Sequence, residues 1–208
     1  RVVEHSLWLL GRSRVEVMMI HEPEWPQWAL DPKQGGIVLD TLEKLKREGV
    51  IGAIGMGGID CNFMASMIET DRIDVVLNFM HYDLAVQDAT HRLLPAARKH
   101  DVGVILGGPF RQGALAEKQH ERIAEMRRTK IYPWGFDEEV LRRIDGIYAL
   151  ADDWEMSLSE MGIRFLLSDP QISTIIPGPR KVAELKSNIE AALKGPLPQD
   201  MVERIKAL

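Results

Sequence analysis

The chain has 208 residues, is 45% hydrophobic and 27% charged, and carries a formal net charge of −5. This length allows one domain with a substantial core, and the apolar content excludes a largely disordered chain. The charge argues against a nucleic-acid or polybasic membrane-binding surface, and no apolar run is long enough to predict a transmembrane helix. A single cysteine, Cys61, excludes an internal disulfide and favours a reducing compartment such as the cytoplasm.

The first part of the chain alternates amphipathic segments with short apolar ones. Residues 2–10 predict a helix that ends at Gly11, because glycine commonly follows the last residue of a helix. An apolar run at 15–20 predicts a strand that ends at His21. Residues 37–48 repeat apolar side chains at helical spacing and predict a second helix.

The same order of strand and helix continues through the rest of the chain. Between residues 106 and 137 lies a long insertion rich in charge. The further predicted strands are 51–56, 74–78, 102–106 and 173–176, and the further predicted helices are 62–69, 88–99, 137–153, 157–167, 180–193 and 199–207.

Strands that alternate with helices, without a hairpin signal between them, predict an α/β protein with a parallel sheet. The sheet either stays open and doubly wound or closes into a (β/α)₈ barrel. Five strand-then-helix units cannot close an eight-stranded barrel, which takes about 250 residues. A barrel therefore predicts that residues 1–208 are the C-terminal part of a single larger domain. The first residues are not a signal peptide. Arg1 is also not expected to be a natural start, since it lacks Met and begins inside a helical pattern.

In both folds the ligand binds at the carboxyl ends of the strands. The residues that follow the predicted strands are His21, Gly57-Gly58, Asn78, 107–110 and 177–180. A histidine suits proton transfer, and a glycine-rich backbone allows close approach of a phosphate or a flat ring. Each feature alone is more often structural, but together on one edge they favour a ligand site.

Other candidate features are predicted to be structural. Cys61 has no metal ligand near it in sequence, so neither a reactive thiol nor a metal site is expected. The neighbours His81, Tyr82 and Asp83 are tempting as a catalytic set, but adjacent side chains do not point together. The charge run 117–122 predicts a solvated loop or helix face. The chain contains no GxGxxG, P-loop, HExxH or CxxC motif, which disfavours a Rossmann dehydrogenase.

Several segments resemble, in order along the chain, those of the aldo/keto reductase family. They begin with Ser6–Gly11 and His21-Glu22-Pro23, and continue with residues 42–55. The turn from Gly107 to Leu115 is similar to that of the branch containing D-threo-aldose 1-dehydrogenase (L-fucose dehydrogenase) and pyridoxal 4-dehydrogenase. A Pro-Gly-x-Arg element with a later Asn, at 177–188, completes a resemblance over nearly the whole chain. These motifs are specific together and weak apart.

The resemblance implies a (β/α)₈ TIM barrel of which this chain covers roughly strands 4 to 8. It implies an oxidoreductase that moves a hydride between NAD(P)H and a sugar or small-molecule carbonyl or alcohol. In the family's Asp-Tyr-Lys-His tetrad, His21 matches the histidine, which orients the substrate oxygen and shares the proton-transfer network. The resemblance implies that the other three residues belong to earlier strands and are not in this sequence. Tyr82 and Tyr132 do not lie at the family position. The fragment alone is therefore expected to be inactive.

The resemblance also implies cofactor contacts. At the nicotinamide, the family's Ser-Asn pair is replaced by Gly57-Gly58, an amide falls at Asn78 or Phe79, and the stacking aromatic corresponds to Gly107. The positions that match the pyrophosphate loop are Gly108, Phe110, Gly113 and Leu115, and those that match the adenosine end are Gly178, Arg180, Glu184 and Asn188.

The choice between NAD and NADP depends on charges at the adenosine end. Glu184 and Gly178 stand where NADPH-preferring relatives place an arginine and a lysine, which favours NAD. Arg180 and Lys181 leave NADP open.

Two other functions remain open. One is a non-catalytic binding or regulatory subunit that keeps the barrel fold, and the other is an open-sheet nucleotide-binding domain. The latter lacks a phosphate-binding glycine fingerprint after its first strand. The expected partners are a small-molecule carbonyl or alcohol and a second copy of the chain, with no nucleic acid and no membrane.

Overall fold

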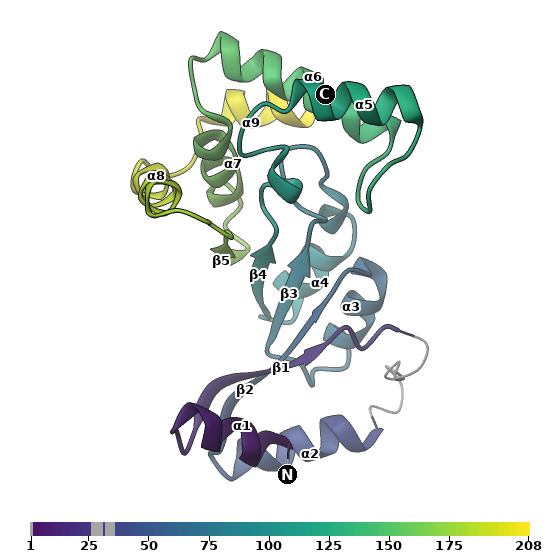
Figure 1. Cartoon of the computed structure of the whole chain (residues 1–208). Helices are drawn as coiled ribbons and strands as arrows, with labels where there is room; N and C mark the ends of the chain where they lie inside the picture. The colour runs from purple at the N-terminus through teal and green to yellow at the C-terminus, as the bar shows by residue number, and fades with distance from the viewer. Residues whose placement is uncertain (1, 26–30, 32–35) are drawn as a thin grey trace. The chain divides into compact units, whose positions relative to one another are not determined.

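The computed structural model describes residues 2–25, 31 and 36–208. The chain divides into two compact units (Figure 1). The first unit contains Arg1–Asn78 and Ala89–Ile105, and the second contains Phe79–Asp88 and Leu106–Leu208.

A parallel sheet forms the centre of the first unit. β2 pairs in parallel with β1 and with β3, in a register that places His21 opposite Gly57 and Gly58 opposite Asn78. This confirms the predicted α/β class and parallel pairing. The hydrogen-bonded strand order is β1 (Val15–His21), β2 (Ile51–Gly58), β3 (Val75–Phe79) and β4 (Gly103–Gly107).

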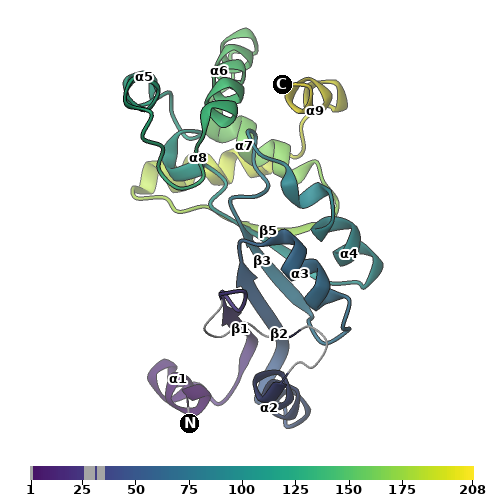
Figure 2. The same ribbon diagram turned by 90° about the vertical axis from the view of Figure 1, so that its right-hand side faces the viewer.

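Helices precede or follow these strands as the sequence predicts. Figures 1 and 2 both show α3 and α4 side by side, next to the sheet. Methionines supply part of the core, since Met56, Met64 and Met67 are fully buried. The helices are α1 (Val2–Leu10), α2 (Gly36–Arg47), α3 (Cys61–Ile68) and α4 (Leu93–Lys99).

The segment after β3 departs from the prediction of one helix over 88–99. A short 3₁₀ helix, η1 (Asp88–Thr90), is separated from α4, which begins at Leu93. The physical reason is Pro95. Proline has no N–H to donate and its ring clashes with the carbonyl four residues earlier, so it is tolerated only in the first turn of a helix.

Asp60 fixes the start of α3. Its carboxylate accepts hydrogen bonds from the backbone N–H groups of Asn62 (2.8 Å) and Phe63 (2.9 Å), which have no partner within the helix.

We expect Asp60→Ala to lower the free energy of unfolding by about 0.5–2 kcal/mol, because two backbone donors lose their acceptor. Urea unfolding followed by circular dichroism measures the effect. Asp60→Asn is the matched control, since an amide oxygen retains the cap. An alanine variant that unfolds at the wild-type urea concentration would show that the cap contributes nothing.

The second unit is mostly helical. α7 lies against α8, α6 and β5, and its Phe165 and Leu166 are buried. The element bounds are η2 (Arg111–Gly113), α5 (His120–Thr129), α6 (Glu138–Asp153), α7 (Leu158–Leu167), β5 (Ile172–Ile176), α8 (Val182–Leu193) and α9 (Gln199–Lys206).

Two elements of this unit, α8 and α5, differ from the sequence predictions by more than one residue. α8 begins at Val182 rather than at residue 180, because the backbone of Lys181 is extended (φ −131°, ψ 151°). α5 lies in the charged insertion, where no helix was predicted. It buries Ile123 and Met126, a face too narrow to stand out among charged neighbours. The run 117–122 enters the first turn of this helix, as the prediction of a solvated loop or helix face allows.

Large apolar side chains remain exposed on both units. On α1, Trp8 is 74% exposed and Leu9 is 66% exposed. On α8, Val182 is 71% exposed and Leu193 is 82% exposed. Over the described ranges, no helix combines the length and the apolar content needed to cross a membrane.

Candidate functional site

The carboxyl ends of β1, β2 and β3 gather three of the predicted site residues in the first unit. His21 ends β1 and lies opposite Gly57 of β2, and the next residue of β2 lies opposite Asn78 of β3. The sequence expectation that these strand ends lie next to one another is therefore met within this unit.

His21 presents an accessible imidazole. Its side chain is 89% exposed, and its Nδ1 lies 3.9 Å from Oε2 of Glu22. The backbone of Glu22 has a φ of +45° and its N–H donates a 2.7 Å hydrogen bond to the carbonyl of Gly57. These contacts hold the chain just after His21 against β2, while the ring itself stays open to solvent. A buried turn histidine, which was the structural alternative, is not what the structure shows.

Glu24 contacts the end of β2 beside Gly58. Its Oε1 accepts a 2.7 Å hydrogen bond from the N–H of Ile59. A Cβ on Gly58 would lie 2.5 Å from that oxygen. A larger residue at position 58 would therefore displace the carboxylate of Glu24 from the end of β2. Hydropathy gives no signal for this contact, because the two residues lie in different segments.

Asn78 faces α3. It is fully buried, and its Nδ2 lies 3.5 Å from Sγ of Cys61 and 3.8 Å from Sδ of Met64. A Cβ on Gly57 would make an ordinary van der Waals contact with Leu77, at 3.7 Å, so packing does not require a glycine there. The nicotinamide contacts proposed for Asn78 and Gly57 stay predictions, and the direction of the Asn78 side chain gives them no support.

The second unit contains a cavity of about 660 Å³. Two segments that are far apart in sequence form much of its wall, the turn after β4 and the segment from β5 into α8. Leu115, by contrast, is fully buried and does not line the cavity. The predicted cofactor residues in the wall are Gly108, Phe110, Gly113, Gly178, Arg180, Glu184 and Asn188.

The turn after β4 has an unusual backbone. Gly108 and Gly113 have φ values of +66° and +92°, and the non-glycine residues Arg111 and Gln112 have values of +41° and +51°. A Cβ on Gly108 would lie 2.8 Å from the ring of Phe79, so no larger residue fits there. Each non-glycine residue in this region costs about 1–3 kcal/mol. The surroundings must therefore hold this turn in place.

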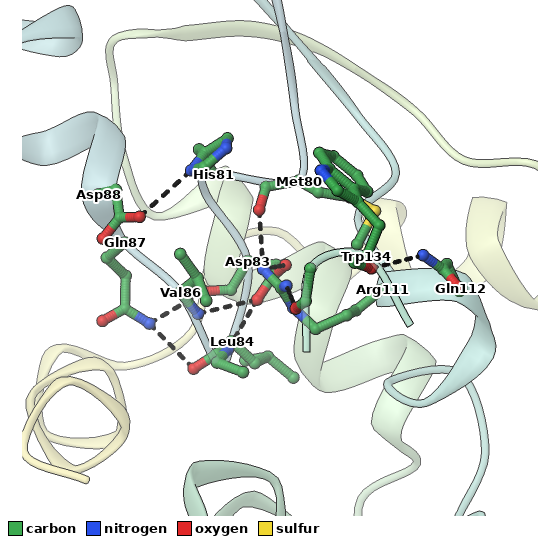
Figure 3. Close-up of polar contacts among 12 residues, drawn as sticks. Met80, His81, Asp83, Leu84, Val86, Gln87, Asp88, Arg111, Gln112 and Trp134 are labelled. Carbon is green, nitrogen blue, oxygen red and sulfur yellow. Dashed lines mark hydrogen bonds and ion pairs between the residues drawn. The ribbon is translucent and has the colours of Figure 1, made fainter. Parts of the chain in front are cut away.

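A buried ion pair joins Arg111 of this turn to Asp83 (Figure 3). Nη2 of Arg111 is 2.7 Å from Oδ2 of Asp83, and the two side chains are 2% and 0% exposed. The same Nη2 donates a 2.7 Å hydrogen bond to the carbonyl of Met80, and Nη1 donates to the carbonyl of Gly135. Burial raises the pKa of Asp83 from its ordinary value, and the nearby guanidinium opposes that rise.

His81 and Tyr82, which precede Asp83, have other partners. Nδ1 of His81 lies 3.2 Å from Asp88, whereas the hydroxyl of Tyr82 donates a 3.1 Å hydrogen bond to Asp169. Burial and the nearby Asp169 carboxylate raise the pKa of Tyr82. The three neighbouring side chains point to three different partners, as the sequence analysis predicted, and do not form a catalytic set.

At the other end of the cavity, a charged pair stands beside a buried amide. The N–H of Arg180 donates a 2.7 Å hydrogen bond to Glu184, and its guanidinium lies 3.8 Å from the same carboxylate. The hydrogen bond from the Arg180 backbone holds the pKa of Glu184 below its ordinary value. Asn188 is 7% exposed and contributes to the wall.

The sequence analysis did not predict that the aromatic ring of Phe79 is part of the cavity wall. The ring of Phe79 stacks on that of Trp134, with centroids 5.9 Å apart and planes 10° apart. Phe79 lines the cavity. Within the described ranges, no group of three or more His, Cys, Asp or Glu side chains is arranged to hold a metal ion.

Comparisons with known proteins show the family of this chain. The model of the aldo/keto reductase family matches residues 1–208. The chain is 28% identical over 189 residues to a D-threo-aldose 1-dehydrogenase of Pseudomonas sp, covering 90% of this chain and 55% of that protein. It is 24% identical over 198 residues to a pyridoxal 4-dehydrogenase of Microbacterium luteolum, covering 91% of this chain and 55% of that protein. The chain thus spans about half the length of these relatives.

A solved structure shows the same fold. The holo form of an aldo-keto reductase from Bacillus halodurans superposes with a TM-score of 0.72 at 19% identity, over 99% of this chain and 65% of that one. The α/β fold with its parallel sheet is therefore that of the TIM-barrel class to which these enzymes belong. With the family model matching from end to end, the chain belongs to the aldo/keto reductase family.

Proposed function

We propose that the protein containing this chain is an NAD(P)-dependent oxidoreductase that interconverts a sugar or small-molecule alcohol and its carbonyl form by hydride transfer. The observation that carries this proposal is the cavity of the second unit. It combines a glycine-rich turn, an exposed arginine and a buried amide in one wall. Membership of the aldo/keto reductase family supports the reaction type.

The cavity wall fits a dinucleotide. A volume of about 660 Å³ lies within the range of small-molecule sites, roughly 300–1,000 Å³. Phe110 has a negative φ of −109°, and the next three residues have positive values. The N–H groups of Arg111, Gly113 and Ala114 donate to carbonyls of the same turn, so this backbone gives the wall its shape while its N–H groups are already engaged. A Cβ on Gly178 would meet nothing within 4 Å among the described residues, so a ligand has open room there.

The adenosine end has groups for both charge and base recognition. The side chain of Arg180 is 80% exposed and lines the cavity, where it suits a phosphate. Asn188 offers an amide with both donors and an acceptor, as the edge of a heteroaromatic base requires. Across the described part of the chain, the structure gives the Asn188 side chain no hydrogen-bond partner.

In this proposal His21 acts at the substrate. The exposed imidazole at the end of β1 would orient the substrate oxygen and exchange a proton with its surroundings. The nicotinamide cofactor, when bound, gives or takes the hydride. The Asp, Tyr and Lys of the family tetrad are proposed to lie outside these 208 residues, with this chain forming strands 4 to 8 of the barrel. The greater length of the relatives supports that placement.

We propose a preference for NAD over NADP and a place in the cytoplasm. The carboxylate of Glu184 lines the cavity, and its lowered pKa keeps it charged at neutral pH. A carboxylate near the 2′-phosphate of NADP is unfavourable, because the two negative charges repel each other. Arg180, 3.8 Å from that carboxylate, offsets part of this repulsion, so the preference is expected to be moderate.

We expect Asn188→Leu to raise the dissociation constants of NADH and NADPH by about tenfold, because one hydrogen bond to a buried ligand group is worth about 1 kcal/mol or more. Arg180→Met should do the same and raise the cofactor KM more than it lowers kcat, because it removes binding common to the ground and transition states. Fluorescence titration of the full-length protein measures both.

Asn62→Leu, at an exposed position of α3, is the matched control and should leave both dissociation constants unchanged. A full-length protein that binds neither dinucleotide contradicts the proposal. Binding without turnover of any alcohol, aldose or pyridoxal would instead favour the non-catalytic subunit.

A further inference from the structure

We infer that the buried pair of Asp83 and Arg111 is a positioning device that holds the turn Gly108–Gly113 in the shape that receives the cofactor. The inference rests on the proposed function, because it assigns the turn to dinucleotide binding. Arg111 lines the cavity, where an arginine would ordinarily be taken for a phosphate ligand. Its contacts point to a different role.

The guanidinium of Arg111 is already engaged on several sides. Nη2 contacts the carboxylate of Asp83 and the carbonyl of Met80, each at 2.7 Å. Nη1 donates to the carbonyl of Gly135. Because its charge faces Asp83 and the side chain is 2% exposed, little of it remains for an incoming anion.

The other partner of the ion pair, Asp83, is held in place by hydrogen bonds from the backbone. Asp83 is fully buried, and its Oδ1 accepts hydrogen bonds from the N–H groups of Ala85 (2.8 Å) and Val86 (2.9 Å). The carboxylate therefore cannot follow Arg111 if the turn shifts. Figure 3 shows this arrangement, with Val86 and Arg111 both in contact with the carboxylate of Asp83. The ion pair thus fixes the strained backbone at Arg111, whose φ is +41°.

A hydrogen bond from the side chain holds the next residue of the turn, Gln112, to the segment at 134–135. Nε2 of Gln112 donates a 2.9 Å hydrogen bond to the carbonyl of Trp134, and the ring of Trp134 stacks on Phe79. Phe79 and Gln112 both line the cavity. Side-chain contacts therefore join the turn at 108–113 to the segments at 79–83 and 134–135.

Arg164 provides a matched control, because it makes the same kinds of contact away from the cavity. Its Nε donates to the carbonyl of Gly195 (3.1 Å) and its Nη2 to that of Pro196 (3.3 Å). Its Nη1 pairs with Glu160 at 3.0 Å. Among the described residues that line the cavity, none is Arg164 or one of its partners Glu160, Gly195 and Pro196. A structural arginine and a positioning arginine can therefore be compared directly.

The test compares Arg111→Met with Arg164→Met in the full-length protein. Both should lower the melting temperature. Arg111→Met should raise the dissociation constants of NADH and NADPH by about tenfold or more, with kcat at saturating cofactor changed by less than about threefold. Arg164→Met should leave the dissociation constants within about twofold of the wild type.

Hydrogen exchange of the cofactor-free protein gives a second readout. The N–H groups of Gly113 and Leu115 bond to the carbonyl of Phe110, and that of Ala114 bonds to the carbonyl of Arg111. These three amides should exchange faster in Arg111→Met and at the wild-type rate in Arg164→Met. If Arg111→Met does not fold, Arg111→Lys replaces it. An ammonium keeps the charge but lacks the fork that spans several acceptors, so a smaller change in the same direction is expected.

The outcomes separate the two hypotheses. Equal effects of the Arg111 and Arg164 variants on binding and exchange would overturn the positioning role while leaving the cofactor site intact. A wild-type protein that binds no dinucleotide would overturn the proposed function, and the positioning role with it.

Discussion

Replacing His21 by alanine in the full-length protein is expected to lower kcat by about 10²–10⁴-fold, with little change in cofactor affinity or melting temperature. Loss of one acid–base or oxyanion-stabilising group commonly costs this much. The side chain of His21 is 89% exposed, so its removal opens no cavity in the core. In the proposal His21 contacts the substrate oxygen while the residues that line the cavity hold the dinucleotide, so cofactor affinity should not depend on the imidazole.

The measurements are kcat, the dissociation constant of NADH from fluorescence quenching, and the melting temperature, all on the same preparations. His91→Ala is the control, because His91 is another exposed histidine of the first unit. Full turnover by the His21 variant would remove this residue from the mechanism. A joint fall in stability and turnover would make its role structural.

Local pattern was enough to predict most of the fold. The strand 15–20 was predicted to end at His21, and β1 does end there, because apolar periodicity and the polar residue after it coincide. The prediction of one helix over 88–99 was wrong. It gave apolar spacing more weight than the missing N–H of Pro95. The helix α5 was not predicted, because two buried side chains, Ile123 and Met126, are too few to indicate a buried helix face.

The candidate site was predictable where glycines mark the backbone. Gly108, Gly113 and Gly178 line the cavity, and the first two have the positive φ that glycine permits. The pair of Asp83 and Arg111 was not predictable, because it joins residues of separate segments. Arg111 holds a position of the turn Gly107–Leu115 to which the resemblance gave no role, and Asp83 was set aside with its neighbours His81 and Tyr82.

Asn78 illustrates a different difficulty. Side chains of a strand alternate between its two faces, so a shift of one residue exchanges the face toward α3 for the opposite one. The sequence allowed the amide position to fall at Asn78 or Phe79. In the structure Asn78 contacts Cys61 of α3, whereas Phe79 lines the cavity.

The 208-residue chain on its own is expected to self-associate, because it exposes apolar side chains on two helices and an unpaired strand edge. On α8, Val182, Leu185, Ile189 and Leu193 recur at helical spacing and are 45–82% exposed. β1 is the first strand in the order of the sheet and has a partner on one side, β2, among the described strands. Exposed apolar stripes and open strand edges both promote association.

Light scattering after size-exclusion chromatography, over a range of protein concentrations, measures this association. The double variant Leu185→Lys with Ile189→Lys should shift the distribution toward monomer, because it places charges within the α8 stripe. Lys186→Arg, on the same helix, keeps the charge and is the matched control. If the proposed barrel is right, the full-length protein covers these surfaces, and its association should not respond to dilution in the same way. A 208-residue chain that stays monomeric at every concentration and unfolds cooperatively would contradict the proposal that it is one part of a larger barrel.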